Sequence, residues 1–107
     1  MDYLEFIETT AFSKVRAELI EDDEFQELQI YLLKYHEHGD TISQTGGCKK
    51  IRWGRKGMGK RGGVRVIYYV RTLSGRLYLL FVYPKNVQED LTQDQKAQLK
   101  DAVQHMK

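Results

Sequence analysis

Residues 49–69 read KKIRWGRKGMGKRGGVRVIYY and decide the fold of this 107-residue chain. Apolar and basic residues alternate on both sides of a glycine-rich centre, which predicts two antiparallel strands joined by a loop over 54–63. The first strand, 48–53, places Lys50 and Arg52 on one face and Ile51 and Trp53 on the other. The second strand spans 64–71. This hairpin, extended to residue 71, holds nine of the 17 Lys and Arg residues and no Asp or Glu, a composition suited to gripping a polyphosphate.

The rest of the chain supplies a sheet and helices around this hairpin. Residues 3–9 alternate weakly as a first strand, and apolar residues at helical spacing predict helices over 11–20 and 21–38. The apolar run LYLLFVY at 77–83 predicts a central strand, and TQDQ at 92–95 matches a capping box that starts a last helix. We therefore expect one α+β domain over 1–107, with the order βααβββα and an antiparallel sheet that has helices packed on one face.

Charge is distributed unevenly along the chain. Residues 1–40 sum to −8, residues 41–88 to +11 and residues 89–107 to −1, which gives the net charge of +2. This dipolar pattern favours an anionic partner at the middle segment, although acidic helices could instead neutralise the basic hairpin within the fold. The single cysteine, Cys48, excludes an internal disulfide. With neither a signal peptide nor a membrane span in the pattern, we expect a cytoplasmic protein.

Several short motifs resemble nucleotide-binding, metal-binding or catalytic patterns, but each lacks a required feature. The loop GRKGMGKR at 54–61 nearly spells a phosphate-binding P-loop, but Arg61 stands where Ser or Thr is needed and a strand follows instead of a helix. The dinucleotide and kinase glycine motifs fail for similar reasons. The acidic run at 21–24 is interpreted as a helix start and not as a metal site. A catalytic histidine pair is not indicated, because nothing in the sequence brings His36, His38 or His105 to the basic hairpin.

The basic and aromatic residues can nonetheless carry out RNA cleavage. Attack by a ribose 2′-hydroxyl needs a group that accepts its proton, a group that stabilises charge on the phosphorane, and a group that protonates the leaving 5′ oxygen. Lys, Arg and Tyr supply all three without a metal or another cofactor. The available set is Lys50, Arg52, Lys56, Lys60, Arg65, Lys85, Tyr68, Tyr69 and Tyr83. From the residues alone, both catalysis and simple binding of RNA or of an acidic protein stay open.

An ordered set of short motifs resembles a known family over essentially the whole chain. These motifs are GGCKKIR (46–52), GMGKRGG (57–63), RVIYY (65–69), LL (79–80), YPKN (83–86) and DLT (90–92). Together they resemble the RelE/HigB family of type II toxins within the RelE/ParE superfamily, and most of all its HigB-like members. The resemblance implies a RelE-like, microbial-ribonuclease-like fold, and ribosome-dependent cleavage of mRNA in the A site of the 70S ribosome. It also implies a cognate HigA-like antitoxin with a helix-turn-helix DNA-binding domain, so that DNA is contacted only through the antitoxin.

The resemblance also implies roles for individual residues. The expected catalytic residues are Lys50, Arg52, Arg65, Lys85 and Tyr83. Those expected to hold ribosomal or messenger RNA are Lys49, Arg55, Lys56, Lys60, Arg61, Tyr69 and Asn86. No tyrosine follows Tyr83, although some relatives place a catalytic tyrosine at the start of the last helix, so the general base is left open between Tyr69, Tyr83 and no tyrosine at all.

Two other functions compete with RNA cleavage. ParE-like members of the superfamily inhibit DNA gyrase and generally lack basic residues clustered on the central strands, whereas this chain has Lys50, Arg52 and Arg65 there. A non-catalytic module that binds RNA or the ribosome would show salt-dependent affinity and form no product.

Overall fold

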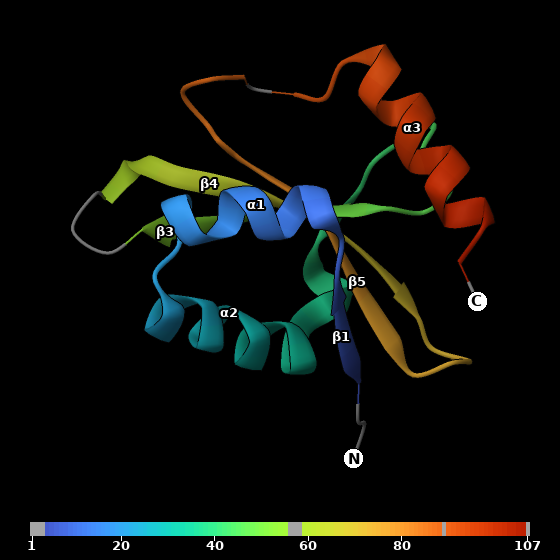
Figure 1. Ribbon diagram of the computed structural model, residues 1–107, viewed down its shortest axis with the longest axis horizontal. Helices are drawn as coiled ribbons and strands as arrows, with labels where there is room; N and C mark the ends of the chain where they lie inside the picture. The colour runs from blue at the N-terminus through green and yellow to red at the C-terminus, as the bar shows by residue number, and fades with distance from the viewer. Residues whose placement is uncertain (1–3, 56–58, 89, 107) are drawn as a thin grey trace.

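The structure, a computed structural model, describes residues 4–55, 59–88 and 90–106, without the side chains of residues 55–62. Its elements, in chain order, are β1 (Glu5–Glu8), α1 (Thr10–Leu19), α2 (Asp22–Tyr35), the 3₁₀ turn η1 (His36–His38), β2 (Asp40–Thr41), β3 (Lys49–Arg55), β4 (Gly59–Arg71), β5 (Arg76–Pro84) and α3 (Gln93–Gln104) (Figure 1). The expected α+β fold and the order of its main elements are confirmed, with the two-residue β2 added before the hairpin.

The five strands form one mixed sheet in the order β1-β5-β4-β3-β2. Strands β3, β4 and β5 run antiparallel, as expected, and the added β2 also pairs antiparallel with β3. The expectation of an antiparallel sheet is wrong for β1, which lies parallel to β5 with Phe6 opposite Leu77. Strand β5 lies between β1 and β4, in agreement with its apolar sequence, and residues 77–80 are all buried. The sheet therefore holds the basic hairpin against a largely apolar and buried strand.

The hairpin strands are longer than the sequence indicated. The expected loop over 54–63 is wrong in its bounds, because β3 continues to Arg55 and β4 already begins at Gly59, with these two residues paired. The pairing shifts register between Trp53 and Arg55. A glycine inside a strand often marks such an irregularity, since it has no side chain to pack, and here Gly54 lies at that shift.

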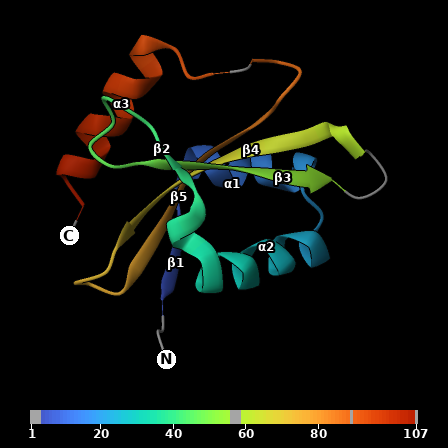
Figure 2. The same cartoon turned by 180° about the vertical axis from the view of Figure 1, so that it is seen from behind.

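Two apolar clusters cover the two faces of the sheet. Alternate β4 residues Val64, Val66 and Tyr68 pack in the first cluster with α1 and α2, whereas Ile67 packs in the second with Val103 of α3. The expectation that helices pack on one face is therefore correct for α1 and α2 but not for α3, which lies against the opposite face (Figures 1 and 2). Because strand side chains point alternately to either side, a strand buried on both faces needs cover on both.

Local capping sets the starts of α1 and α3. The Thr9 side chain accepts a hydrogen bond from the Phe12 backbone N–H, and Thr92 forms the expected capping box with Gln95. Helix α3 is thereby directed back across the sheet after the segment that follows β5. No helix in the described part of the chain is both long enough and apolar enough to cross a membrane.

Candidate functional site

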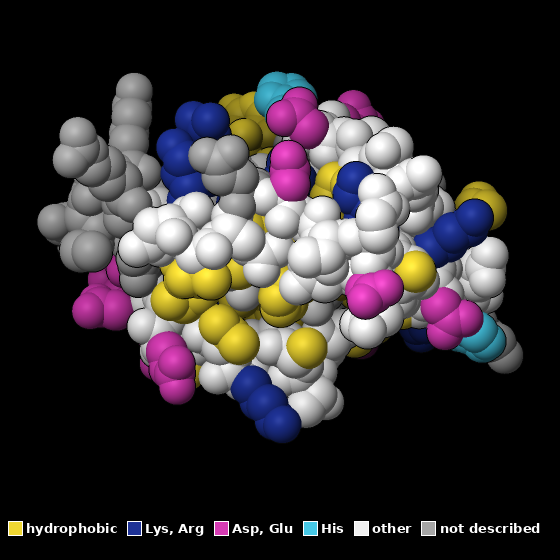
Figure 3. All heavy atoms as spheres, turned by 90° about the horizontal axis from the view of Figure 1, so that it is seen from above, with side chains coloured by type: hydrophobic (Ala, Val, Ile, Leu, Met, Phe, Trp, Pro, Cys, Tyr) yellow, Lys and Arg dark blue, Asp and Glu magenta, His cyan; other side chains and the backbone are white. Residues whose placement is uncertain are grey.

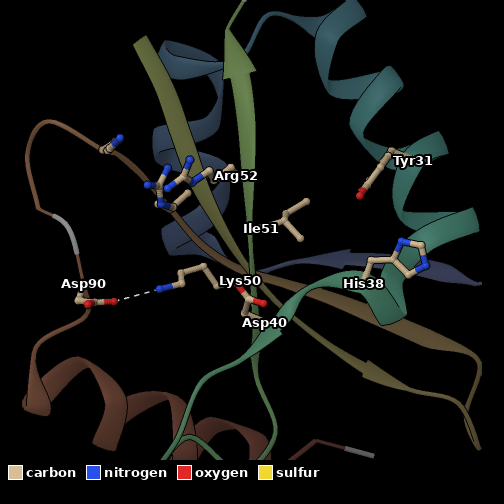
Figure 4. A pocket seen from close by; sticks show the side chains of 9 residues that line it. Tyr31, His38, Asp40, Lys50, Ile51, Arg52 and Asp90 are labelled. Carbon is tan, nitrogen blue, oxygen red and sulfur yellow. Dashed lines mark hydrogen bonds and ion pairs between the residues drawn. The ribbon is translucent and has the colours of Figure 1, made fainter. Parts of the chain in front are cut away.

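Four cationic side chains from three parts of the chain line one open cavity of about 510 Å³. Lys50 and Arg52 project from β3, Arg65 lies opposite Arg52 on β4, and Lys85 follows β5 (Figure 4). The backbone N–H of Lys85 donates to the carbonyl of Gly63 at 3.2 Å, which ties this residue to β4. We call these four residues the cation pocket.

Arg65 is the most enclosed member of the cation pocket. It is only 7% exposed, yet it makes no salt bridge within the described residues. Burying a charge is unfavourable unless it is paired or hydrogen-bonded, so a guanidinium that has no salt bridge to the described residues and lines a cavity favours binding of an external anion. A guanidinium can clamp a phosphate through two parallel N–H donors.

Lys50 already has an anionic neighbour. Its Nζ lies 3.0 Å from the Oδ1 of Asp90, in the segment between β5 and α3. The hydrogen bond and charge of Lys50 hold the pKa of the Asp90 carboxyl below its usual range. The carboxylate therefore stays ionised at neutral pH, and it sits among the cations at the place where an external anion would bind.

Tyr83, expected to be catalytic, lies beneath the cation pocket and not in its lining. Tyr83 pairs with Arg65 across β4 and β5, is 3% exposed and packs against Phe81 at 5.5 Å between ring centroids. Its hydroxyl is buried and has no hydrogen-bond partner among the described residues. Burial raises the pKa of this hydroxyl, and the Asp90 charge adds to the rise. A raised pKa makes the phenol a poorer proton acceptor at neutral pH.

Three of the residues expected to hold RNA lie outside the cavity lining. The Nζ of Lys49 donates to the carbonyl of Gly39 and to the hydroxyl of Thr41, which ties β3 to the segment before it. Tyr69 packs in the cluster under α3, and Asn86 is exposed in the turn after β5. The side chains of the other four, Arg55, Lys56, Lys60 and Arg61, lie outside the described residues.

Sequence reasoning missed four residues that line the same cavity: Tyr31, His38, Asp40 and Asp90. Tyr31 and His38 approach β3 from the far side of the strand, as Figure 4 shows. His38 was set aside because nothing in the sequence placed it near the hairpin, and the pairing of Asp40 with Lys50 in β2 and β3 brings it there. The only sequence feature that could have indicated a role for His38 is the HEH run at residues 36–38, which ends a helix just before a strand too short to recognise.

In the space-filling view, Lys and Arg side chains gather on one part of the face shown (Figure 3). Among the residues that the structure describes, no group of three or more His, Cys, Asp and Glu side chains could hold a metal ion.

Comparison with known proteins identifies the family. The sequence matches, over residues 8–107, the family described as the RelE toxin of the RelE/RelB toxin–antitoxin system. A solved structure of a mutant of the E. coli toxin RelE in the free state shares the fold, with a TM-score of 0.62 and 14% sequence identity, covering 99% of this chain and 100% of that chain. The fold, the basic hairpin and the family match over nearly the whole chain agree, and the protein therefore belongs to the RelE family of type II toxins.

Proposed function

We propose that this toxin is a ribosome-dependent endoribonuclease that cleaves mRNA in the A site and so inhibits translation, without a metal ion. The observation that carries the proposal is Arg65, a buried cation without a salt-bridge partner in the described chain, which lines one cavity together with Lys50, Arg52 and Lys85. Such a site is prepared for the scissile phosphate of an RNA strand.

The reaction that suits these groups is an internal transesterification. The ribose 2′ oxygen attacks phosphorus, the bond from phosphorus to the 5′ oxygen breaks, and a cyclic 2′,3′-phosphate and a free 5′-hydroxyl result. In this proposal Arg65 and Arg52 stabilise the negative charge that develops on the phosphorane. Lys85 protonates the leaving 5′ oxygen, and Lys50 takes part in removal of the 2′ proton once RNA has displaced Asp90.

The HigB-like relationship and the partners remain part of the proposal. The resemblance of the motifs supports a HigA-like, helix-turn-helix antitoxin as the neutralising protein, with the 70S ribosome and mRNA as targets. The basic middle segment supports both kinds of partner, since an acidic antitoxin segment and an RNA strand compete for the same charges.

The test is cleavage of a defined mRNA by the purified toxin, read by primer extension with and without 70S ribosomes. We expect codon-phased cuts only when ribosomes are present. Arg65→Met keeps the buried aliphatic volume and removes the charge, and we expect the single-turnover rate to fall by about 10²- to 10³-fold, the loss typical of one electrostatic stabiliser. Arg71→Met is the matched control, because Arg71 is on the same strand but away from the cavity lining.

Stability separates a catalytic defect from misfolding. A buried charge carries a desolvation cost, and an apolar side chain of similar volume at the same position does not. We therefore expect Arg65→Met to unfold in urea no more easily than the wild type. A stable Arg65→Met variant that cuts at the wild-type rate would contradict the proposal. Translation blocked without cuts would favour a binding inhibitor, and gyrase inhibition without cuts would favour ParE-like action.

A further inference from the structure

Four rings follow one another along the outer side of the β3 edge. Trp53 of β3 lies 5.6 Å from Tyr31 of α2, Tyr31 lies 5.2 Å from Tyr35, and Tyr35 lies 5.2 Å from His38 of η1, measured between ring centroids. Successive rings are tilted by 54°, 46° and 36°. We call these four residues the aromatic ladder.

Core packing accounts for only one half of the aromatic ladder. Trp53 and Tyr31 are half-buried and pack against the cluster beneath α1 and α2. Tyr35 is 43% exposed, and His38 is also exposed. The ladder thus leads from the core to the surface, where Tyr35 and His38 are exposed to solvent. Aromatic faces are sequence-tolerant platforms for the unpaired bases of single-stranded nucleic acid.

The aromatic ladder shares its cavity with the cation pocket. Tyr31 and His38 line the same 510 Å³ cavity as Lys50 and Arg65, and β3 passes between the two groups (Figure 4). Trp53 lines a smaller adjoining cavity of about 140 Å³ together with Arg52, Arg65 and Lys85. The larger volume lies within the range of about 300–1,000 Å³ that is typical of small-ligand sites.

The surface that carries His38 is held in place from two sides. The Tyr68 hydroxyl, on β4, donates to the His36 carbonyl in η1, and the Lys49 Nζ donates to the Gly39 carbonyl just after it. Such anchoring lowers the entropy lost when a ligand binds. Asp40, the next residue, lines the cavity and offers a carboxylate that can accept hydrogen bonds from the amino group of a base.

We propose that the aromatic ladder is a stacking subsite for an unpaired base of the RNA strand whose phosphate occupies the cation pocket. The proposal rests on the proposed function for the identity of the phosphate. A base and its phosphate are joined through one ribose, so a strand that crosses the β3 edge places the phosphate on one side and the base on the other. Stacking on the ladder would then add to the RNA affinity that the cation pocket provides through phosphate binding.

The experiment uses two oligonucleotides that the toxin cannot cleave. One is a 2′-O-methyl RNA hexamer without self-pairing, and the other is an abasic hexamer with the same number of phosphates. Dissociation constants are measured at low salt from the fluorescence of Trp53, the only tryptophan in the chain. We expect the wild type to bind the base-containing hexamer on the order of 5- to 150-fold more tightly, the range typical of one stacked base.

Variants locate this preference in the ladder. We expect the double variant Tyr35→Ala/His38→Ala to lose most of the preference while its affinity for the abasic hexamer is unchanged. Tyr35→Phe keeps the ring and should keep the preference. Ile30→Ala and Leu33→Ala are matched controls, because these side chains are 50% and 37% exposed on the same helix but lie outside the ladder.

Two results would overturn the subsite. One is equal affinity of the wild type for the two hexamers, or no affinity for either. The other is an equal loss for both hexamers in the double variant, since the rings would then act on phosphate binding. Neither result depends on cleavage, so failure of the subsite is distinguishable from failure of the ribosome-dependent nuclease, which the primer-extension assay tests separately.

Discussion

At the scale of single residues, Asp90 and Arg65 set the charge of the site in opposite directions. Arg65 is buried and has no salt bridge in the described chain. The exposed Asp90 carboxylate, in contrast, forms an ion pair with Lys50, with 3.0 Å between its Oδ1 and the Lys50 Nζ. An RNA phosphate that enters the cation pocket must therefore displace or rearrange Asp90. This competition is a cost of binding that a single substitution of Asp90 would remove.

We expect Asp90→Asn to bind the 2′-O-methyl hexamer about 2- to 5-fold more tightly at neutral pH, because solvent screens an exposed charge and its removal changes the affinity only modestly. The measurement is a fluorescence titration at low salt. Asp101→Asn, on α3, removes the same charge away from the cavity and should leave the affinity unchanged. A gain of equal size in both variants would show that only net charge matters.

The pKa of Asp90 sets the pH range in which the wild type and Asp90→Asn should differ in RNA affinity. Because the pKa of the Asp90 carboxyl is lowered in the folded chain, the Lys50–Asp90 pair is present above its usual value of 3.8 and is lost as pH falls through the lowered folded-state pKa. The difference between the wild type and Asp90→Asn should therefore hold across neutral pH. A carboxyl titration followed by NMR at or above pH 3.8 would contradict the ion pair.

At the scale of elements, the contact between β4 and η1 positions one side of the site. Tyr68 is fully buried, its hydroxyl donates to the His36 carbonyl, and burial raises its pKa to about 12, so it remains a neutral donor at physiological pH. Gly39 lies so close to this hydroxyl that an added Cβ would overlap it. The glycine thus permits the approach of η1 to the sheet, and with it the placement of His38 and Asp40.

We expect Gly39→Ala to lower the free energy of unfolding by about 1–3 kcal/mol, the usual cost of overpacking. The cost should be smaller in a Tyr68→Phe background, because the clashing oxygen is then absent. Urea unfolding of the two single variants and the double variant measures this coupling. Gly54→Ala is the control, since a Cβ there meets nothing within 4 Å. Additive effects of Gly39→Ala and Tyr68→Phe would mean that the two residues do not interact as described.

At the scale of the whole molecule, charge is segregated between the sheet and the helices. The segment 41–88, which includes strands β3, β4 and β5, carries the entire +11, and the segment 1–40, with α1 and α2, carries −8. The small net charge therefore conceals a strong local field at the cation pocket. Binding of RNA there should release counterions and depend steeply on salt.

We expect Lys85→Ala to make the plot of log affinity against log salt concentration less steep by about 0.7, the value for one phosphate contact on a single strand. The affinity for the 2′-O-methyl hexamer, measured at four or more salt concentrations, gives this slope. Lys100→Ala, on α3 and outside the cavity lining, should leave it unchanged. An unchanged slope for Lys85→Ala would remove Lys85 from the phosphate contacts.

The sequence by itself determined the elements and the chemistry of the hairpin. Alternation in the first hairpin strand placed Lys50 and Arg52 on one face, because strand side chains repeat with a period of two and this rule needs no tertiary context. That Arg65 shares this face follows from its pairing with Arg52, which the structure shows. The apolar run at 77–83 identified a strand buried on both faces, and Thr92 with Gln95 identified the start of α3. These are local rules, and the motifs that resemble the RelE family are also local.

The tertiary structure alone decided which residues meet at the site. His38 reaches β3 because the two-residue β2 pairs Asp40 with Lys50, a contact too short to leave a pattern in the sequence, and Tyr31 reaches it because α2 packs on the sheet. Asp90 contacts Lys50 although the two residues are 40 positions apart in the sequence. Tyr83 is enclosed because α3 covers the face of the sheet on which Tyr83 lies, opposite to α1 and α2. Long-range contacts depend on how whole elements pack, and packing is set by all side chains together and not by the periodicity of any one segment.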